Sequence, residues 1–220
     1  MKKNEFEICL KNYTYPDAFE KIKDIHPCIA RMEHYDQHHP YHNLDLLEHS
    51  VATMRNLRIE DLSPEERNRL MVAAFLHDIG KPDSLVVKYN ILGQPRNTFP
   101  GHPEKSAKIA NEILDALGYG KEDKEYILFY IACHDLFMNF SFSAKGKLAI
   151  NEHNVKRVYE RAHEKFPFTT PHDFFALMHL SVADALAHNP QVIDVDGSIK
   201  DTNTKMAARA KAIQDIFAGF

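Results

Sequence analysis

An apolar stretch that stops abruptly on charged residues places the strongest constraint on how this chain folds. From residue 70 the sequence reads LMVAAFLHDIGKPDS, in which seven apolar residues are followed by His77 and Asp78. Gly80 and Pro82 come soon after, and both residue types end helices. Neighbouring helical side chains point about 100° apart, so an adjacent histidine and aspartate cannot share one helix face. The pattern therefore predicts a buried helix whose end turns His77 and Asp78 in different directions.

Helix-start signals recur along the chain and predict a mostly helical protein. The segment SPEE at 63–66 forms a capping box, with Ser63 as N-cap and Pro64 as the first helical residue. Thr170 caps a later helix in the same way, with Asp173 three residues on. The expected helices open at Pro16 and at Pro27 (the latter reaching about Tyr35), and the others cover about 44–57, 64–76, 103–117, 122–137, 155–165, 171–189 and 203–218.

One segment changes character. Residues 84–99 read SLVVKYNILGQPRNTF, in which a β-prone run is followed by turn residues and a second short run. This order predicts a small β-hairpin or an irregular excursion. No repeat, low-complexity tract or linker divides the chain. We therefore expect one domain over residues 1–220, an all-α bundle of six to nine helices with one hairpin at most.

The composition narrows the class of protein. The formal net charge of -4 argues against a surface that coats nucleic acid, while a nucleotide or an RNA end is still open as substrate. No apolar run approaches the roughly 18 residues of a membrane span, and the start of the sequence lacks the apolar region of a signal peptide. Three cysteines without a CxxC spacing predict reduced thiols and a cytoplasmic location.

Histidine is the unusual component, with 14 copies in a chain that has no tryptophan. His134 and Asp184 stand in apolar helical stretches, where a carboxylate is costly unless it is paired or binds a metal. Each residue alone has an ordinary explanation, because most buried histidines are hydrogen-bonded core residues. Asp184 could pair with an arginine, and His102 could simply start a helix. Only the set taken together, with His49 and His77 included, predicts a metal site.

The motifs EHS at 48–50, HDIGK at 77–81 and ADA at 183–185 follow one another in this chain, with His49 and His77 separated by 28 positions. This order resembles the HD-domain superfamily of metal-dependent phosphohydrolases, in its HDIG form. The contexts FPGHPEKSAKIA and IACHD are most similar to the HD domain of bacterial CCA-adding tRNA nucleotidyltransferases. The resemblance covers about residues 40–190. The nucleotidyltransferase motif of those enzymes is missing, so we expect a stand-alone HD-domain helical bundle.

The resemblance implies a set of metal ligands. Asp78 would bridge two ions, and Asp184 could also orient the attacking water. Mixed histidine and carboxylate ligands suit Mn, Fe, Co, Ni or Zn better than Ca, with Mg possible. One ion would be held by His49, His77, Asp78 and Asp184, and a second by Asp78, His102 and His134.

Four further residues could have roles in the site, and most of them also have a simpler explanation. Lys81 could contact a phosphate, or it could be a solvated surface lysine. His42 resembles a proton-donating histidine of cyclic-nucleotide phosphodiesterases, although its spacing from His49 is longer, and it could equally be a loop residue. Arg157 is a candidate phosphate contact by analogy with the adding enzymes, and otherwise an exposed helical arginine. His188, one turn after Asp184, could support that carboxylate.

The predicted function is hydrolysis of a phosphomonoester or phosphodiester in a nucleotide, cyclic nucleotide or RNA end. Asp78, Lys81 and His42 are the predicted catalytic residues, and Lys81 and Arg157 the predicted substrate contacts. Two alternatives stay open: a di-iron oxygenase on the same fold, and a non-catalytic sensor that binds a nucleotide. The expected partner is a small phosphorylated substrate. The sequence predicts no oligomeric state and assigns no role to residues 1–40, 84–99 or 191–220.

Overall fold

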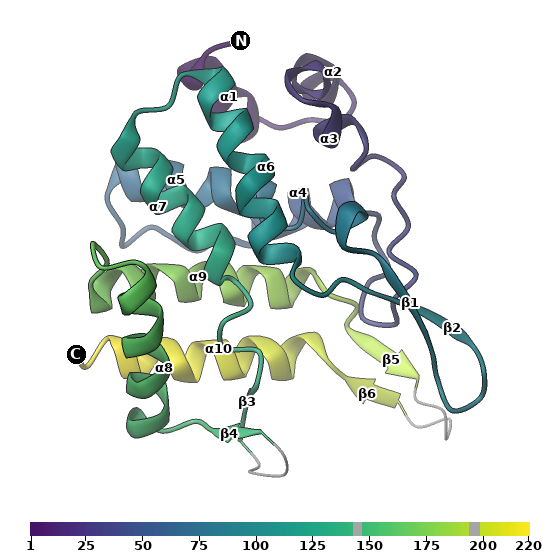
Figure 1. Cartoon of the computed structure of the whole chain (residues 1–220), viewed down its shortest axis with the longest axis vertical. Helices are drawn as coiled ribbons and strands as arrows, with labels where there is room; N and C mark the ends of the chain where they lie inside the picture. Colours follow the sequence, from purple (N-terminus) through teal and green to yellow (C-terminus); the bar gives the residue numbers. More distant parts are fainter. Residues whose placement is uncertain (143–146, 194–198) are drawn as a thin grey trace.

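The computed structural model describes residues 1–142, 147–193 and 199–220, and within these ranges it is a helical bundle with three small strand pairs (Figure 1). Two short 3-10 helices, η1 and η2, cover Lys23–Ile25 and Pro82–Ser84. The α-helices are α1 (Lys3–Lys11), α2 (Asp17–Ile22), α3 (Pro27–Ala30), α4 (Leu46–Asn56), α5 (Pro64–Leu76), α6 (His102–Leu117), α7 (Lys121–Cys133), α8 (Glu152–Lys165), α9 (Pro171–Ala187) and α10 (Asn203–Phe217). The strands are β1 (Val86–Tyr89), β2 (Pro95–Thr98), β3 (Phe140–Ser141), β4 (Leu148–Ala149), β5 (Gln191–Ile193) and β6 (Ile199–Asp201).

The all-α prediction is confirmed, but two of its counts are wrong. The described residues contain ten α-helices rather than six to nine, and three two-stranded pairs rather than one hairpin at most. Helix α1 was not predicted, although its Phe6 and Leu10 are spaced one turn apart and both are buried. The antiparallel pair β5–β6 and the parallel pair β3–β4 were missed because strands of two or three residues carry no readable alternation.

The helix predicted to run from Pro27 to about Tyr35 ends at Ala30. The residues that were expected to continue this helix instead form hydrogen bonds with the first turn of α4. The backbone N–H groups of Leu46 and Leu47 donate to the carbonyls of Tyr35 and Met32, at 3.1 Å in both cases. The first N–H groups of a helix have no partner within the helix, so this contact satisfies two of them. Tertiary pairing therefore ended a helix that the local sequence favoured.

Helix α5 forms the centre of the core. The predicted capping box at Ser63 and Glu66 is present, and the helix is buried from Val72 to Leu76 with no exposed side chain. It packs against α1, α4, α7 and α9, and α9 in turn lies along α10 (Figure 1). The C-terminal ends of α5 and α7 and the N-terminal end of α6 meet beside α9. The predicted Thr170 cap and Pro171 start of α9 are also confirmed.

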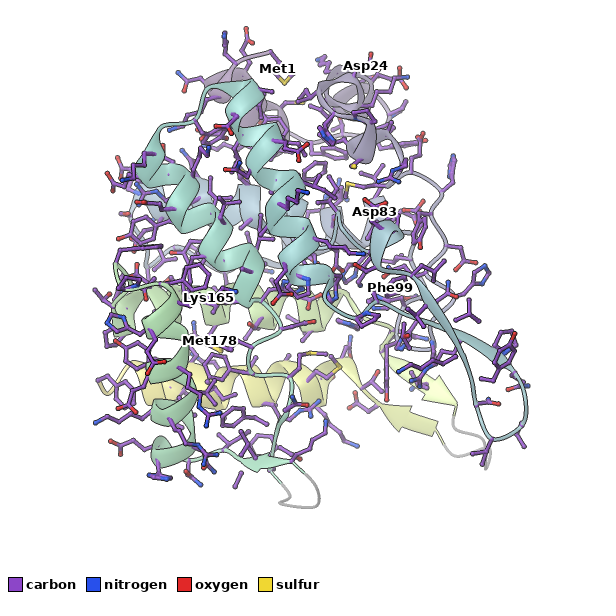
Figure 2. The ribbon with its side chains drawn as sticks, in the orientation of Figure 1. Met1, Asp24, Asp83, Phe99, Lys165 and Met178 are labelled. Atoms are coloured by element: carbon purple, nitrogen blue, oxygen red, sulfur yellow. The ribbon has the colours of Figure 1, made fainter. Side chains whose placement is uncertain are left out.

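The predicted hairpin is present as the antiparallel pair β1–β2, with Val86 opposite Thr98 and Tyr89 opposite Pro95. It projects from the helical body (Figure 1), and Figure 2 places Phe99 where the hairpin returns to that body. The chain then enters α6, whose first residue is His102. The excursion at 84–99 is thus part of the connection between the end of α5 and the start of α6.

The structure also bears on the predictions about the cysteines and about membrane spans. Cys9, Cys28 and Cys133 are all free thiols. Among the residues that the structure describes, no helix combines the length and apolar character that crossing a membrane requires.

Gly80 permits a close contact between α6 and the turn that follows α5. Its N–H donates to the Ser106 hydroxyl of α6 at 2.9 Å. A Cβ atom at Gly80 would lie 2.5 Å from the backbone nitrogen of Ser106 and 2.9 Å from the carbonyl carbon of Lys105. These distances are too short for non-bonded heavy atoms, so only glycine lets α6 approach this turn.

We predict that Gly80→Ala destabilises the protein by about 1–3 kcal/mol, because α6 must move away from the turn that follows α5. The free energy of unfolding, measured by urea titration, checks this. Gly219→Ala is the matched control, since the nearest atom to its Cβ position is the Ile216 carbonyl oxygen at 3.4 Å, an ordinary van der Waals distance. Equal stability of the two variants would contradict the role assigned to the close contact.

Candidate metal centre

All six predicted metal ligands converge at one buried point. His49 comes from the middle of α4, and Asp184 from the last turns of α9. His77 and Asp78 follow the last residue of α5, and His134 follows the last residue of α7. The sixth, His102, is the first residue of α6. Each is at most 9% exposed.

The two carboxylate oxygens of Asp78 face two different pairs of histidines. Its Oδ2 lies 3.4 Å from Nε2 of His49 and 3.2 Å from Nε2 of His77. Its Oδ1 lies 3.1 Å from Nε2 of His102 and 3.6 Å from Nε2 of His134. The prediction that His77 and Asp78 turn in different directions is therefore wrong, because after the helix end both side chains reach the same cluster. Only Oδ1 of Asp78 turns away from His77, toward His102 and His134.

A second carboxylate lies beside each of these two pairs of histidines. Asp184 Oδ1 lies 3.0 Å from Nε2 of His49 and 3.6 Å from Nε2 of His77. On the other side, Asp135 lies 3.4 Å from His102 and 3.6 Å from His134 through its two oxygens. Asp135 was not among the predicted ligands. The signal that could have found it is the repeated His-Asp succession, at 77–78 and again at 134–135.

Backbone carbonyls determine which ring nitrogen of three histidines faces the cluster. Nδ1 of His77 lies 2.8 Å from the Ala74 carbonyl oxygen, and Nδ1 of His134 lies 2.7 Å from that of Ile131. Nδ1 of His102 lies 2.9 Å from the Phe99 carbonyl oxygen. A carbonyl only accepts hydrogen bonds, so each Nδ1 must carry the proton. In the neutral ring this leaves the Nε2 lone pair free to bind a cation.

These residues fit a divalent metal ion. Nε2 of His49, Nε2 of His77, Oδ1 of Asp78 and Oδ1 of Asp184 are buried without a hydrogen-bond partner. Lone pairs held about 3 Å apart repel unless a proton or a cation lies between them. Three sets of side chains have ligand atoms within 4.8 Å of one another: His49, His77 and Asp184; His77, Asp78 and His134; and His102, His134 and Asp135.

The charges of the cluster also favour a cation. Burial would raise the pKa of Asp78, but His77 and Lys81 outweigh it and hold that pKa well below its usual range. The pKa of Asp184 is likewise held low against burial, chiefly by His188 and His49. Burial would lower the pKa of His77, yet the two carboxylates raise it to about 10. The carboxylates therefore stay ionised and attract a proton to Nε2 of His77. A metal ion would take the place of that proton, because only the neutral ring binds a metal.

Lys81 is a buried member of the cluster and not a solvated surface residue. Only 5% of it is exposed. Its Nζ lies 2.6 Å from Oδ2 of Asp78 and donates to Oε1 of Gln37 at 2.8 Å. Gln37 was not predicted, because a glutamine in a loop carries no signal of burial. The ammonium group of Lys81 thus shares the oxygen of Asp78 that faces His49 and His77.

His42 lies beside the cluster, although it belongs to a loop and not to α4. Its Nε2 is 3.4 Å from Nζ of Lys81, and its ring centre is 4.9 Å from that of His49. Burial, with the nearby charge of Lys81, lowers the pKa of His42 far below its usual range. The His188 ring lies 4.5 Å from that of His42, and Nδ1 of His188 is 2.8 Å from the Asp184 carbonyl oxygen.

A sequence model of the HD domain matches residues 46–194, which is more than half of the chain. The chain belongs to the HD-domain family. No curated protein matches it. The closer similarity to the HD domain of CCA-adding enzymes, the HDIG subtype and the extent of one domain over 1–220 stay predictions.

The candidate metal centre of this HD domain opens into a cavity of about 200 Å³. The structure does not bring Arg157 to it. Arg157 is exposed on α8, and α8 contributes no residue to the cavity, so a phosphate contact from that side chain is not supported. The lining residues are His39, His42, Asp78, Lys81, Thr98, Phe99, His102, His134, Asp135, Met138, Asp184 and His188.

We predict that Asp78→Asn lowers the metal content of this HD domain more than His134→Ala does. Asp78 faces both pairs of histidines, whereas His134 belongs to one side of the cluster. Metal analysis after dialysis against Mn²⁺ or Co²⁺ checks this, together with the rise in Tm on metal addition, which follows mass action.

The control for that comparison is His172→Ala. His172 is an exposed residue of α9 whose Nε2 contacts Glu66 at 2.8 Å, away from the cluster. We expect this variant to bind as much metal as the unmodified chain. Unchanged metal content in Asp78→Asn would refute the assignment of these residues as ligands.

Proposed function

We propose that this HD domain is a metal-dependent phosphohydrolase acting on a phosphomonoester or phosphodiester of a nucleotide, cyclic nucleotide or RNA end. The observation that carries the proposal is the Asp78 carboxylate, which lies between two pairs of histidines and also contacts Lys81. A carboxylate placed in this way suits a bridge between two metal ions. Phosphoester hydrolysis needs such a concentration of positive charge, because negative charge builds on the phosphoryl oxygens.

The proposed ligand sets follow the contacts of Asp78. His49, His77, Asp78 and Asp184 would hold one ion, and Asp78, His102 and His134, joined by Asp135, would hold the other. The nitrogen and oxygen donors suit Mn, Fe, Co, Ni or Zn, with Mg possible. When bound, such ions lower the pKa of a water molecule and polarise a phosphoryl oxygen.

The protein's own side chains would then orient the reactants. Oδ1 of Asp184 faces His49 and His77 and would bind the ion, and Asp184 also lines the cavity, so its second carboxylate oxygen could accept a hydrogen bond from the attacking water. Lys81 brings a positive charge to the same cavity and would neutralise part of the phosphate. His42 contacts the Lys81 ammonium group, so the pair could pass a proton to the leaving group. The roles of Lys81 and His42 are part of the proposal.

A nucleotide-sized substrate is the proposed partner, and nucleic-acid coating is not, since the chain carries a net charge of -4. The same ligands also suit two irons that activate oxygen, so the oxygenase alternative has to be part of the test. A non-catalytic sensor finds less support, because every predicted ligand reaches the cluster.

We predict that the protein releases p-nitrophenol from p-nitrophenyl phosphate or its bis ester when Mn²⁺ or Co²⁺ is supplied. Asp78→Ala should lower kcat/KM by at least roughly 100- to 1,000-fold, because it removes the shared ligand. The rate should be the same with and without oxygen, and EDTA should stop it. A folded, metal-loaded protein that hydrolyses no ester in a nucleotide and phosphoester panel would overturn the proposal, and an oxygen-dependent turnover would favour the oxygenase.

We also predict that Lys81→Met lowers kcat by about 10- to 100-fold while most of the metal stays bound. Methionine keeps much of the side-chain volume but removes the charge that faces the cavity. Lys121→Met serves as control, because that side chain is 88% exposed on α7. Rates from ester hydrolysis and metal content from the same preparation separate the two effects. If the loss of activity merely tracks a loss of metal, Lys81 acts as a support for Asp78 and has no direct role.

A further inference from the structure

A larger compartment adjoins the metal cavity. It measures about 660 Å³, against about 200 Å³ for the cavity above the cluster. The two share His39, His42, Met138 and His188 as lining residues, so these side chains lie between them. The larger compartment is bordered by the loop at 39–42, the β3–β4 region, the end of β6 and the start of α10.

The two compartments differ in the size of the group that each can hold. Sites for small molecules usually measure about 300–1,000 Å³. The metal cavity is below that range, so it suits a phosphoryl group and its immediate neighbours but not a whole nucleotide. The rest of such a substrate must extend outward, and the larger compartment lies directly beside the cavity.

The larger compartment carries an excess of positive charge. Lys147, Lys205 and Arg209 line it, and Asp201 is the single carboxylate among the lining residues. Within the described part of the chain, neither Lys147 nor Lys205 forms an ion pair. The Arg209 guanidinium donates to the Phe140 carbonyl at 3.3 Å, which orients it beside β3. Because the whole chain is negatively charged, this concentration of cations is a local feature.

Apolar side chains complement the cations. Tyr41, Met138 and Phe142 line the compartment, with 37%, 50% and 66% of their surfaces exposed. Exposed aromatic rings beside cations suit a nucleobase that stacks while its phosphate pairs with lysine or arginine.

The wall that carries Tyr41 is held in place by polar contacts. The N–H of Asn189 donates to the Tyr41 carbonyl at 2.7 Å, and the Thr202 hydroxyl donates to the Asn189 carbonyl. Thr202 lies at the entry to α10, the helix that carries Lys205 and Arg209. In Figure 1 strand β6 leads directly into that helix. The loop and the cationic helix are therefore fixed relative to one another.

We propose that this compartment binds a second, non-scissile phosphate, so that the preferred substrate is a nucleotide carrying at least two separated phosphate groups. Lys147, Lys205 and Arg209 bind the second phosphate, while the scissile one enters the cavity at the metal centre. This proposal rests on the proposed function, because it assumes that the cavity at the cluster receives the reacting phosphate.

The test compares adenosine 3′,5′-bisphosphate with adenosine 5′-monophosphate on the full-length chain. Binding is measured by equilibrium dialysis in EDTA, which stops metal-dependent turnover of either nucleotide. We expect the bisphosphate to bind at least about 10-fold more tightly, and the advantage to shrink as salt is raised. Lys205→Glu and the double variant Lys205→Ala/Arg209→Ala should reduce the advantage to less than about 3-fold.

The matched control is Lys211→Glu on the same helix, which changes the net charge as much as either test variant does. Lys211 does not line the compartment, and it pairs with Asp215 at 3.2 Å on an exposed part of α10. This control should keep the full preference, because the lost charge lies outside the compartment. Hydrolysis of p-nitrophenyl phosphate, which has no second phosphate, should be unchanged in Lys211→Glu.

The outcomes separate this proposal from the proposed function. Ester hydrolysis with equal binding of the two nucleotides, or with the same loss in the control variant, overturns the second phosphate site and leaves the hydrolase intact. A bisphosphate preference that falls in the Lys205 and Arg209 variants, in a protein that hydrolyses no ester, supports the phosphate site and overturns the hydrolase.

Discussion

The buried carboxylate of Asp78 is the group on which the arrangement of this HD domain depends. An isolated buried charge costs several kcal/mol, so it persists only where other groups compensate it. Here four histidines and Lys81 surround two oxygen atoms, and they come from α4, the ends of α5 and α7, and the start of α6. These elements must meet at one point, and the close contact at Gly80 is what lets α6 reach it.

The helix ends explain why histidines stand where they do. The last four carbonyls of a helix have no partner within the helix, and the C-terminus carries partial negative charge. The carbonyls of Ala74 and Ile131 are among these groups in α5 and α7, and they accept from Nδ1 of His77 and His134. One contact satisfies the helix end and turns Nε2 toward the cluster. Two negative helix ends directed at one place also favour a cation there.

The sequence predicted the features that depend on local chemistry or on the cost of burial. Capping residues marked α5 and α9, and polar residues within apolar helices indicated the ligands. It failed where long-range contacts decide the outcome. Helix α3 ends early because the residues after it pair with α4, and the burial of Lys81 depends on Gln37, which is distant in sequence. Arg157 was carried over by analogy, and no local signal showed that α8 lies away from the cavity.

The proposed metal centre and the proposed phosphate site are built from different parts of this chain. Each proposed metal ligand lies within residues 46–194, the part that matches the HD domain. Most of the adjoining compartment is built from residues outside that range, among them Tyr41, Lys205 and Arg209. A fold can keep one metal centre and acquire different substrates when the segments around it change. If the compartment binds the second phosphate as proposed, the segments on either side of residues 46–194 would select the substrate of this protein.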